Sequence, residues 1–585
     1  MQSCKIKSIF KDILKYKKEL IVGNLFAILA TLTTVTVPLF IPLLIDELLL
    51  KKGDKLTGFV AEYITPMSLT GYVFFFLALT ILLRFLGVIF ATQQVKNLLI
   101  VSKNISYKLR ESAIEHLKKV SLKEYEGFSV GAITSKLVTD INTVDTFIGT
   151  TVGKLIISIL VLFFTSVILL LINWKLALFI LITNPIVVFF TAKLARKVGK
   201  LKRVENKATE EFQSELNDTL ELFNQIKASN KEEYFFNRVK QKAQSLKDIS
   251  IEFSYKSDRS IRISFFTFLS GYEVFRAVSI LAVAYSDLSI GLMLAIFGYL
   301  WIMMTPTQDI INFQYALSNA KQACKRIDDI FNLKLERQVK ESKNPFLKNE
   351  VFIKLDNLSF GYRDNSLILK DITLDITKNA KVAIVGPSGS GKSTLANLIA
   401  GFYEPTRGDI LYNGISYKSI DPRIIREEIY LILQHPKLFN DTMRFNLTLG
   451  RDFSDKEIKK ALKIAQLDDV VESLENGLDT VVGREGVKLS GGQRQRVAIA
   501  RMVLEEPKVV IFDESTSALD IHTEENLFKD LKEFLRDRLV ITIAHRLSTI
   551  ENSEYIFVLE NGRLVDSGLP EDLLKKDSGY FAKMI

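Results

Sequence analysis

Nine consecutive residues combine glycines, hydroxyl groups and one lysine: Gly386-Pro387-Ser388-Gly389-Ser390-Gly391-Lys392-Ser393-Thr394. They follow an apolar stretch of strand type, Lys381–Val385, and precede a stretch typical of a helix, Leu395–Ala400. A glycine-rich turn between a strand and a helix lets backbone N–H groups wrap a polyphosphate. We expect Lys392 to reach the β- and γ-phosphates and Ser393 to ligate Mg²⁺. A chance glycine-serine turn is the alternative, and the flanking elements argue against it.

A second group of candidate residues is a pair of carboxylates after an apolar run. Lys508–Phe512 is typical of a buried strand, and Asp513 and Glu514 follow it directly. In P-loop enzymes the first acid of such a pair helps to hold Mg²⁺, and the second is placed to polarise the attacking water. Alone the pattern is weak, because solvated acids at a strand end look the same.

A third motif is Leu489-Ser490-Gly491-Gly492-Gln493-Arg494-Gln495-Arg496. We expect it to precede a helix over Val497–Leu504, so that it offers a second cradle of N–H groups at a helix N-terminus. A plain turn is the alternative. The sequence Leu-Ser-Gly-Gly-Gln, located between the glycine-rich loop and the strand that ends in Asp-Glu, argues against a plain turn.

The elements that precede these motifs are long and apolar. A helix that spans a membrane needs about 20 mostly apolar residues, and six stretches of that kind occur in the first 315 or so residues. Buried helices of a large soluble protein are the alternative, but these stretches are too long and too poor in charge. We expect Pro38, Pro42 and Pro306 to kink the first and last of them. The six are Leu20–Leu44, Gly71–Ala91, Leu155–Ile172, Leu176–Ala192, Ile263–Tyr285 and Ile290–Phe313.

Basic residues gather in alternate connections between these segments. The connections over residues 92–154 and 193–262 and the N-terminus are rich in lysine and arginine, which predicts a cytoplasmic side for them. The formal net charge of +10 is thereby explained by a membrane and not by nucleic acid. Six lysines within the first 18 residues argue against a cleavable signal peptide. Cys4 and Cys324, the only cysteines, form no metal motif.

The pattern changes near residue 336. A charged stretch without periodicity, Glu336–Glu350, predicts a linker, and short β runs alternate with helices from Val351 onward. The chain is therefore multi-domain. We expect an all-α six-helix transmembrane domain over residues 1–335 and an α/β P-loop NTPase domain over residues 351–585.

Taken together, these motifs resemble those of ATP-binding cassette (ABC) transporters of the exporter type, in which a membrane domain is fused ahead of an ABC ATPase domain. The resemblance covers essentially the whole chain. It implies that Tyr362 stacks on adenine, that Gln434 contacts Mg²⁺ and water, and that His545 lies near the γ-phosphate. It also implies that the signature residues Ser490, Gly491, Gly492 and Gln493 complete the ATP site of a partner chain. Ser517-Ala518-Leu519-Asp520 matches the D-loop.

The membrane part resembles the family more loosely. Leu122–Gly127 is similar to the first coupling helix, and Gln213–Asp218 to the second, which in this family contacts the partner's cassette. Arg326–Phe331 is similar to the usual end of the sixth helix. One departure precedes the signature, where Thr480–Gly486 reads Thr-Val-Val-Gly-Arg-Glu-Gly instead of Thr-Glu-Val-Gly-Glu-Arg-Gly. It puts the usual glutamate contact of this loop in question.

The resemblance implies an ATPase that exports or flips a lipid, a drug-like amphiphile or a peptide by alternating access, with ATP and Mg²⁺ as cofactors. We expect a homodimer in the inner membrane of a bacterium; a heterodimer is the alternative. The absence of a preceding domain with a Cys/His pair argues against a leader-cleaving peptide exporter. Two further alternatives stay open: an importer on the exporter scaffold, and an ATP-gated channel or regulator. Against the second, Lys392, Gln434, Glu514 and His545 are all present.

Charged residues lie within the apolar segments, among them Arg84, Glu273 and Arg276. Arg84 and Glu273 are predicted near the middle of the bilayer, and Arg276 lies one helical turn from Glu273. Charges at that depth cost at least about 2.5–3.5 kcal/mol each, so they should face the bundle interior or a wet cavity. Two interpretations are open: they line the cargo path, or Glu273 and Arg276 simply pair with each other.

Overall fold

The computed structural model describes residues 11–50, 68–285, 288–348, 350–363, 366–377, 379–483, 486–515, 519–543 and 553–575. The chain forms two compact units. The first comprises residues 1–117 and 130–332, and the second comprises residues 118–129 and 333–585. The first predicted coupling segment thus belongs to the unit that contains the cassette.

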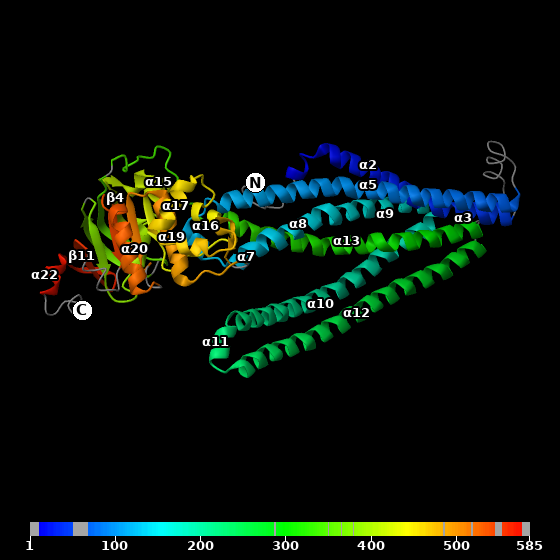
Figure 1. Ribbon diagram of the computed structural model, residues 1–585. Coiled ribbons are helices and arrows are strands. Elements are labelled where there is room, and N and C mark those ends of the chain that lie inside the picture. Colours follow the sequence, from blue (N-terminus) through cyan, green and yellow to red (C-terminus); the bar gives the residue numbers. More distant parts are fainter. Residues whose placement is uncertain are drawn as a thin grey trace. The chain divides into compact units, whose positions relative to one another are not determined.

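The first unit consists of long helices (Figure 1). Among the described residues, five stretches are long and apolar enough to cross a membrane: 17–49, 69–117, 130–172, 232–285 and 290–331. The predicted segment Leu176–Ala192 lies within a sixth long helix, α10, and its assignment as a span stays a prediction. The helices are α2 (Lys17–Thr36), α5 (Leu69–Leu117), α9 (Val152–Ile172), α10 (Trp174–Glu221), α12 (Glu232–Tyr285) and α13 (Ile290–Phe331).

Short elements interrupt or extend these helices. The prolines of the first span lie where the α-helical pattern changes, whereas Pro306 lies inside α13, which continues for 25 residues beyond it to Phe331. Three elements follow α2 and four precede α9. They are η1 (Val37–Leu39), α3 (Phe40–Pro42), η2 (Leu43–Leu49), α7 (Val130–Ser135), η3 (Lys136–Asp140), α8 (Ile141–Thr146) and η4 (Phe147–Thr151).

The α10–α12 hairpin corrects one prediction. Residues Gln213–Asp218 continue α10 to Glu221, and the short helix that joins the two long ones is α11 (Phe223–Ala228). α10 and α12 run side by side in Figure 1, and ion pairs cross between them. Arg238 lies 3.0 Å from Glu215, and Lys242 lies 2.9 Å from Glu211. The prediction rested on a loose resemblance to the family, and that resemblance did not locate the end of α10.

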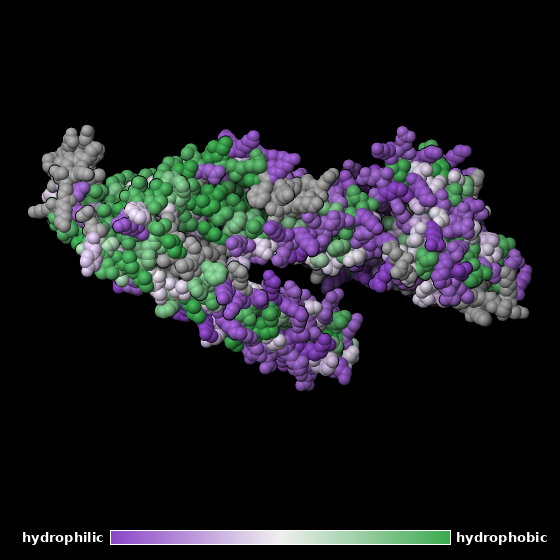
Figure 2. All heavy atoms as spheres, turned by 180° about the vertical axis from the view of Figure 1, so that it is seen from behind, coloured by the Kyte–Doolittle hydropathy of each residue, from purple (hydrophilic) through white to green (hydrophobic). Residues whose placement is uncertain are grey.

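The surface of the first unit is divided by polarity. Figure 2 shows hydrophobic residues gathered over the membrane-spanning part of the helices and hydrophilic residues around the end of the α10–α12 hairpin. Large apolar side chains stay uncovered by the chain itself: Phe74 and Phe266 are 69% exposed and Leu171 is 82% exposed. Such a surface suits lipid or a second protein chain.

The second unit is built on two sheets. In the six-stranded sheet the order is β12-β11-β3-β10-β9-β6, with all strands parallel except β12. The four-stranded sheet has the order β2-β1-β4-β5 and is antiparallel. The strands are β1 (Ile353–Phe360), β2 (Leu369–Ile376), β3 (Lys381–Val385), β4 (Arg407–Tyr412), β5 (Ile415–Ser416), β6 (Ile429–Ile432), β9 (Val509–Asp513), β10 (Leu539–Ile543), β11 (Tyr555–Glu560) and β12 (Arg563–Gly568), with a separate pair β7 (Asp441–Thr442) and β8 (Val481–Val482).

Helices flank these sheets, and the short helix α6 (Leu122–Glu126), which the sequence predicts, also belongs to this unit. The others are α14 (Lys392–Ile399), η5 (Tyr417–Ser419), α15 (Pro422–Glu428), α16 (Met443–Thr448), α17 (Asp455–Ile464), α18 (Asp468–Glu472), η6 (Gly477–Asp479), α19 (Gly491–Glu505), α20 (Ile521–Phe534) and α22 (Pro570–Leu574).

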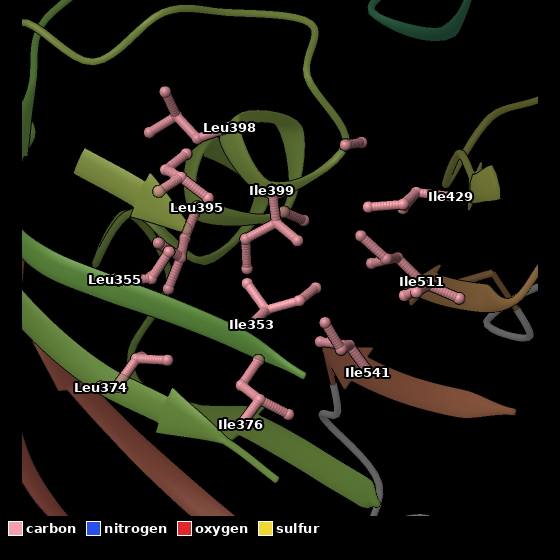
Figure 3. Close-up of a cluster of buried hydrophobic side chains, with 14 of the residues drawn as sticks. Ile353, Leu355, Leu374, Ile376, Leu395, Leu398, Ile399, Ile429, Ile511 and Ile541 are labelled. Carbon is pink, nitrogen blue, oxygen red and sulfur yellow. The ribbon is translucent and has the colours of Figure 1, made fainter. Parts of the chain in front are cut away.

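One apolar core joins the two sheets to α14 (Figure 3). Ile353 and Ile376 come from the antiparallel sheet, Ile511 and Ile541 from the parallel sheet, and Ile399 from the helix; each is at most 1% exposed. Burying such a side chain contributes about 1.5–3 kcal/mol. This core fixes β3, α14 and β9 relative to one another, and these are the elements that carry the candidate site.

Candidate active site

The topology of the parallel sheet brings two of the motifs to one edge. β3, β10 and β9 are parallel neighbours in that order. The glycine-rich loop follows β3, and Asp513 is the last residue of β9, so both lie at the carboxyl ends of strands, where α/β sheets bind ligands. His545 comes two residues after the end of β10 and lies outside the described residues.

The loop before α14 adopts conformations that glycine favours. The φ angles of Gly386, Gly389 and Gly391 are 153°, 79° and 99°. A Cβ atom added to Gly386 would lie 2.0 Å from the carbonyl oxygen of Leu559, so only glycine fits there. α14 begins directly after the loop, which places the positive end of a helix dipole beside it. The arrangement suits an anion.

Lys392 is held inside this loop. Its Nζ donates hydrogen bonds to the carbonyl oxygens of Gly386 at 2.8 Å and Pro387 at 3.0 Å, and the residue is 5% exposed. Burial lowers the pKa of Lys392, while the charges of Glu514 and Asp513 act in the opposite direction. An ammonium group that is buried largely among neutral carbonyls would gain from a bound phosphate.

Two hydroxyl groups in this region, those of Ser393 and Ser390, differ in their hydrogen bonding. Ser393 Oγ donates to Asp513 Oδ1 at 3.0 Å, which joins the loop to β9. Oxygen ligands of this kind are those that Mg²⁺ prefers. Ser390 is 3% exposed, and its Oγ has no hydrogen-bond partner among the described residues. The donor set therefore fits a phosphate with its magnesium ion. Ser388 and Gly389 are exposed at the tip of the loop.

Glu514 has a left-handed backbone, with φ of 45°. This conformation is uncommon for residues other than glycine, and strained residues of this kind often occur at functional sites. Its Oε2 accepts a hydrogen bond from Gln434 Nε2 at 2.6 Å. The carbonyl oxygen of Gln434 in turn accepts from Gln495 Nε2 at 3.1 Å. The carboxylate is thus joined to α19, a connection that the sequence analysis missed because 61 residues separate Gln434 and Gln495.

Three aromatic rings pack together beside the loop. Tyr362 is 37% exposed, and its hydroxyl lies 3.4 Å from Thr394 Oγ1. Its ring meets those of Phe360 and Tyr403 edge to face, at 5.1 and 5.3 Å between centroids. Tyr362 therefore presents ring surface next to α14, as a base-stacking residue must. No sequence motif indicates Tyr403, which follows α14 in a loop.

The signature motif begins a helix instead of preceding one. The predicted start at Val497 is wrong: α19 starts at Gly491, and Gly492 is its second residue. The reason is a capping box that could have been read from the sequence. Ser490 Oγ accepts from Gln493 N at 3.2 Å, and Gln493 Oε1 accepts from Ser490 N at 2.7 Å.

Hydrogen bonds therefore link Ser393 to Asp513 and Gln434 to Glu514, and Thr394 lies beside Tyr362. Within the D-loop motif, Ser517 and Ala518 lie outside the described residues, whereas Asp520 caps α20 by accepting from Thr523 N at 2.9 Å. The atypical Arg484-Glu485 pair also lies outside them.

Comparison with known proteins finds matching family models, similar sequences and a similar solved structure. Residues 20–307 match the model of the ABC transporter transmembrane region, and residues 369–517 match that of the ABC transporter domain. An ATP-dependent lipid A-core flippase of Desulfotalea psychrophila is 28% identical over 98% of both chains. A putative multidrug export ATP-binding/permease protein of Staphylococcus aureus is 31% identical over 82% of this chain and 83% of its own. The solved structure of a bacterial Atm1-family ABC exporter with ATP bound aligns over 97% of both chains, with a TM-score of 0.82 and 27% identity.

Proposed function

This chain belongs to the ABC transporter family, and we propose that it moves a lipid or another amphiphile out of the cytoplasmic leaflet at the expense of ATP. It is a multi-pass membrane protein that hydrolyses ATP in a cytoplasmic domain and drives export. The observation that carries the proposal is the Gln434–Glu514 contact beside the Ser393–Asp513 contact, in a chain with five apolar spans among its described residues.

In the proposed reaction the residues divide the work. Lys392 exchanges its bonds to loop carbonyls for bonds to phosphate oxygens, and Tyr362 stacks on the base. Glu514 accepts the proton of the attacking water, and Gln434 orients that water through the bond it makes to the carboxylate. Mg²⁺, held by Ser393, Asp513 and Gln434, would neutralise phosphate charge. His545 would contact the γ-phosphate.

We propose that two copies of this chain form the transporter. The nucleotide-binding motifs between Gly386 and His545 retain all their catalytic residues. Each copy therefore supplies one complete P-loop and one signature motif. The apolar faces that the chain leaves uncovered support a partner. Expression of this chain alone tests the proposal. A dimer with ATPase activity is expected, whereas a monomer that stays inactive in detergent and in lipid would rule it out.

The cargo class is inferred from two relatives, a lipid A-core flippase and putative multidrug exporters, which both point to an amphiphile. Intramembrane charges support a polar headgroup. Glu273 and Arg276 form an ion pair at 2.6 Å, each about half exposed, and Arg84 is exposed without an ion-pair partner in the described part of the chain. We place Arg84 and this pair on the cargo path, where a wet cavity offsets their cost.

Reconstitution into lipid vesicles tests the function. The measurement is ATPase stimulation by a panel of lipids, drugs and peptides, together with uptake into vesicles whose cassettes face outward. Stimulation with inward accumulation is expected, because cargo then moves away from the cassette side. Accumulation in the opposite direction would indicate an importer, and ATP hydrolysis without movement of any cargo would favour a regulator.

A further inference from the structure

Backbone hydrogen bonds join the segment before the first coupling helix to residues 334–336 at the start of the cassette. The backbone N–H of Ser121 donates to the carbonyl oxygen of Lys334 at 3.1 Å, and that of Glu336 donates to Lys119 at 2.7 Å. Between these bonds, Val120 and Leu335 form an antiparallel β-bridge. α6 follows at once, so its position is set by the same unit that carries the candidate active site.

Two side chains of α6, one helical turn apart, contact the base-stacking region. Lys123 Nζ donates to the carbonyl oxygen of Gly361 at 3.3 Å, directly before Tyr362, and lies 5.9 Å from the centre of the Phe360 ring. Glu126 Oε2 accepts from the hydroxyl of Tyr403 at 2.7 Å. Residues at i and i+3 lie on one face of a helix, so α6 presents this face to the aromatic group.

Tyr403 contacts both Glu126 of α6 and the ring of Tyr362. The residue is 8% exposed, and its ring lies against Tyr362 at an interplanar angle of 88°. Burial raises the pKa of Tyr403 well above its ordinary value, and the hydrogen bond to Glu126 raises it further. The phenol therefore stays protonated at physiological pH and acts as the donor, with Glu126 as the acceptor.

We propose that Tyr403 and Glu126 form a positioning pair through which α6 responds to the nucleotide base, a role that rests on the proposed function. A base stacked on Tyr362 restricts the tilt of that ring. Because Tyr403 packs edge to face on it, the direction of the Tyr403 hydroxyl and the strength of its bond to Glu126 depend on whether a base is present. The base as well as the phosphates then influences the helix that leads to the membrane unit.

Hydrogen exchange of the backbone amides at residues 118–129 tests the proposal without any transport. The background is the Glu514→Gln variant, in which bound nucleotide persists. ATP should slow exchange in this segment, and tripolyphosphate, which offers phosphates but no base, should not. Tyr403→Phe and Glu126→Gln should each reduce the ATP effect about tenfold, since each weakens a hydrogen bond to a charged group.

Tyr412→Phe is the matched control, because the Tyr412 hydroxyl also makes a 2.7 Å bond, in this case to the carbonyl oxygen of Ile399. It removes an equivalent bond from the same unit and should leave the ATP effect unchanged. Equal protection by tripolyphosphate, or full protection in both Tyr403→Phe and Glu126→Gln, would overturn the proposal. An equal loss in Tyr412→Phe would reduce the pair to a structural contact.

A second measurement separates this proposal from the proposed function. In vesicles, the Tyr403→Phe and Glu126→Gln variants should keep the KM for ATP and lose cargo moved per ATP hydrolysed. The double variant should be no worse than Tyr403→Phe alone, because Tyr403→Phe already removes the bond that Glu126→Gln weakens. If the parent protein moves no cargo, the proposed function fails while the exchange experiment still decides the role of the pair.

Discussion

The cassette and the membrane unit differ in how far their apolar side chains are buried within the chain itself. In the cassette, Ile511 and Ile541 are fully buried among residues of the same chain. In the membrane unit, Leu171 and Phe266 stay 82% and 69% exposed. The cassette is thus specified by its own core, whereas the membrane helices depend on lipid and a partner for much of their packing.

Polar groups show the same contrast. In the cassette, Lys392, Ser393 and Asp513 lie together at one edge of a sheet, where they can bind a ligand. The membrane unit uses polar groups to join its own helices. Tyr299 donates to the carbonyl oxygen of Val35 at 2.8 Å, and Ser158 donates to Asp309 at 3.0 Å. The first pattern serves chemistry, and the second adds hydrogen bonds between helices that also share buried apolar clusters, such as the one that contains Val161, Phe275 and Tyr299.

The largest effect is expected at the catalytic edge of the cassette. Glu514→Gln keeps the shape of the side chain and removes the base, so turnover should fall about 10²–10⁴-fold while ATP binding is retained. ATPase rates and binding of a labelled nucleotide measure the two properties. Glu533→Gln, on an exposed face of α20, is the control and should behave as the parent protein. Near-parental hydrolysis by Glu514→Gln would exclude this residue as the base.

The contrast in packing predicts unequal costs for the same substitution. Ile541→Ala opens a cavity between the two sheets and should destabilise the cassette by about 2–5 kcal/mol. Ile81→Ala, on a 59% exposed face of α5, leaves no enclosed cavity and should cost much less. Thermal unfolding of the full chain in lipid discs, followed through loss of ATP binding, compares the two variants. Equal losses would contradict the contrast.

Within the membrane unit, an ion pair with a buried carboxylate is expected to matter more than one in which both partners are exposed. The Asp140 side chain is 5% exposed and accepts from Arg326 Nε at 2.9 Å and Nη2 at 2.5 Å. Asp140→Asn should destabilise this unit by about 1.5–3 kcal/mol, because a charged hydrogen bond is lost. Asp258→Asn breaks the exposed pair with Arg262 and should leave the melting temperature unchanged. A similar shift in both variants would show that burial is not the cause.

The smallest effect concerns cargo. If Arg84 and Glu273 line the cargo path, Arg84→Ala or Glu273→Gln should change the ATPase stimulation by individual compounds about two- to tenfold. Basal ATPase activity and the melting temperature should stay the same. Loss of folding, or an unchanged cargo profile, would instead make these charges internal contacts. The observed ion pair between Glu273 and Arg276 makes Arg84 the more informative variant.

The sequence was most informative where a few residue types at fixed spacing determine the backbone. The predicted strands at Lys381–Val385 and Lys508–Phe512 correspond to β3 and to most of β9, because the glycine-rich loop and the acid pair mark their ends. The start of α19 was misplaced only because the capping box of Ser490 and Gln493 was not used.

Other features depend on contacts between distant residues. The bond from Tyr403 to Glu126 spans 277 positions, and no local pattern indicates it. The left-handed backbone of Glu514 arises from the fold around it, because glutamate has no preference for that conformation. In the membrane unit, the prediction at Gln213–Asp218 rested on a loose family resemblance, which did not locate the end of α10, and α11 lies beyond it at Phe223–Ala228.

The length of the α10–α12 hairpin has a mechanical consequence. α12 has 54 residues, which at about 1.5 Å per residue makes an arm of about 80 Å. A rotation of about 5° at the membrane end therefore moves α11 by about 7 Å, more than the helical pitch of about 5.4 Å. The ion pairs Arg238–Glu215 and Lys242–Glu211 join the two helices near the tip of the hairpin. A hairpin of this length would therefore convert a small rotation at its membrane end into a displacement larger than one helical turn.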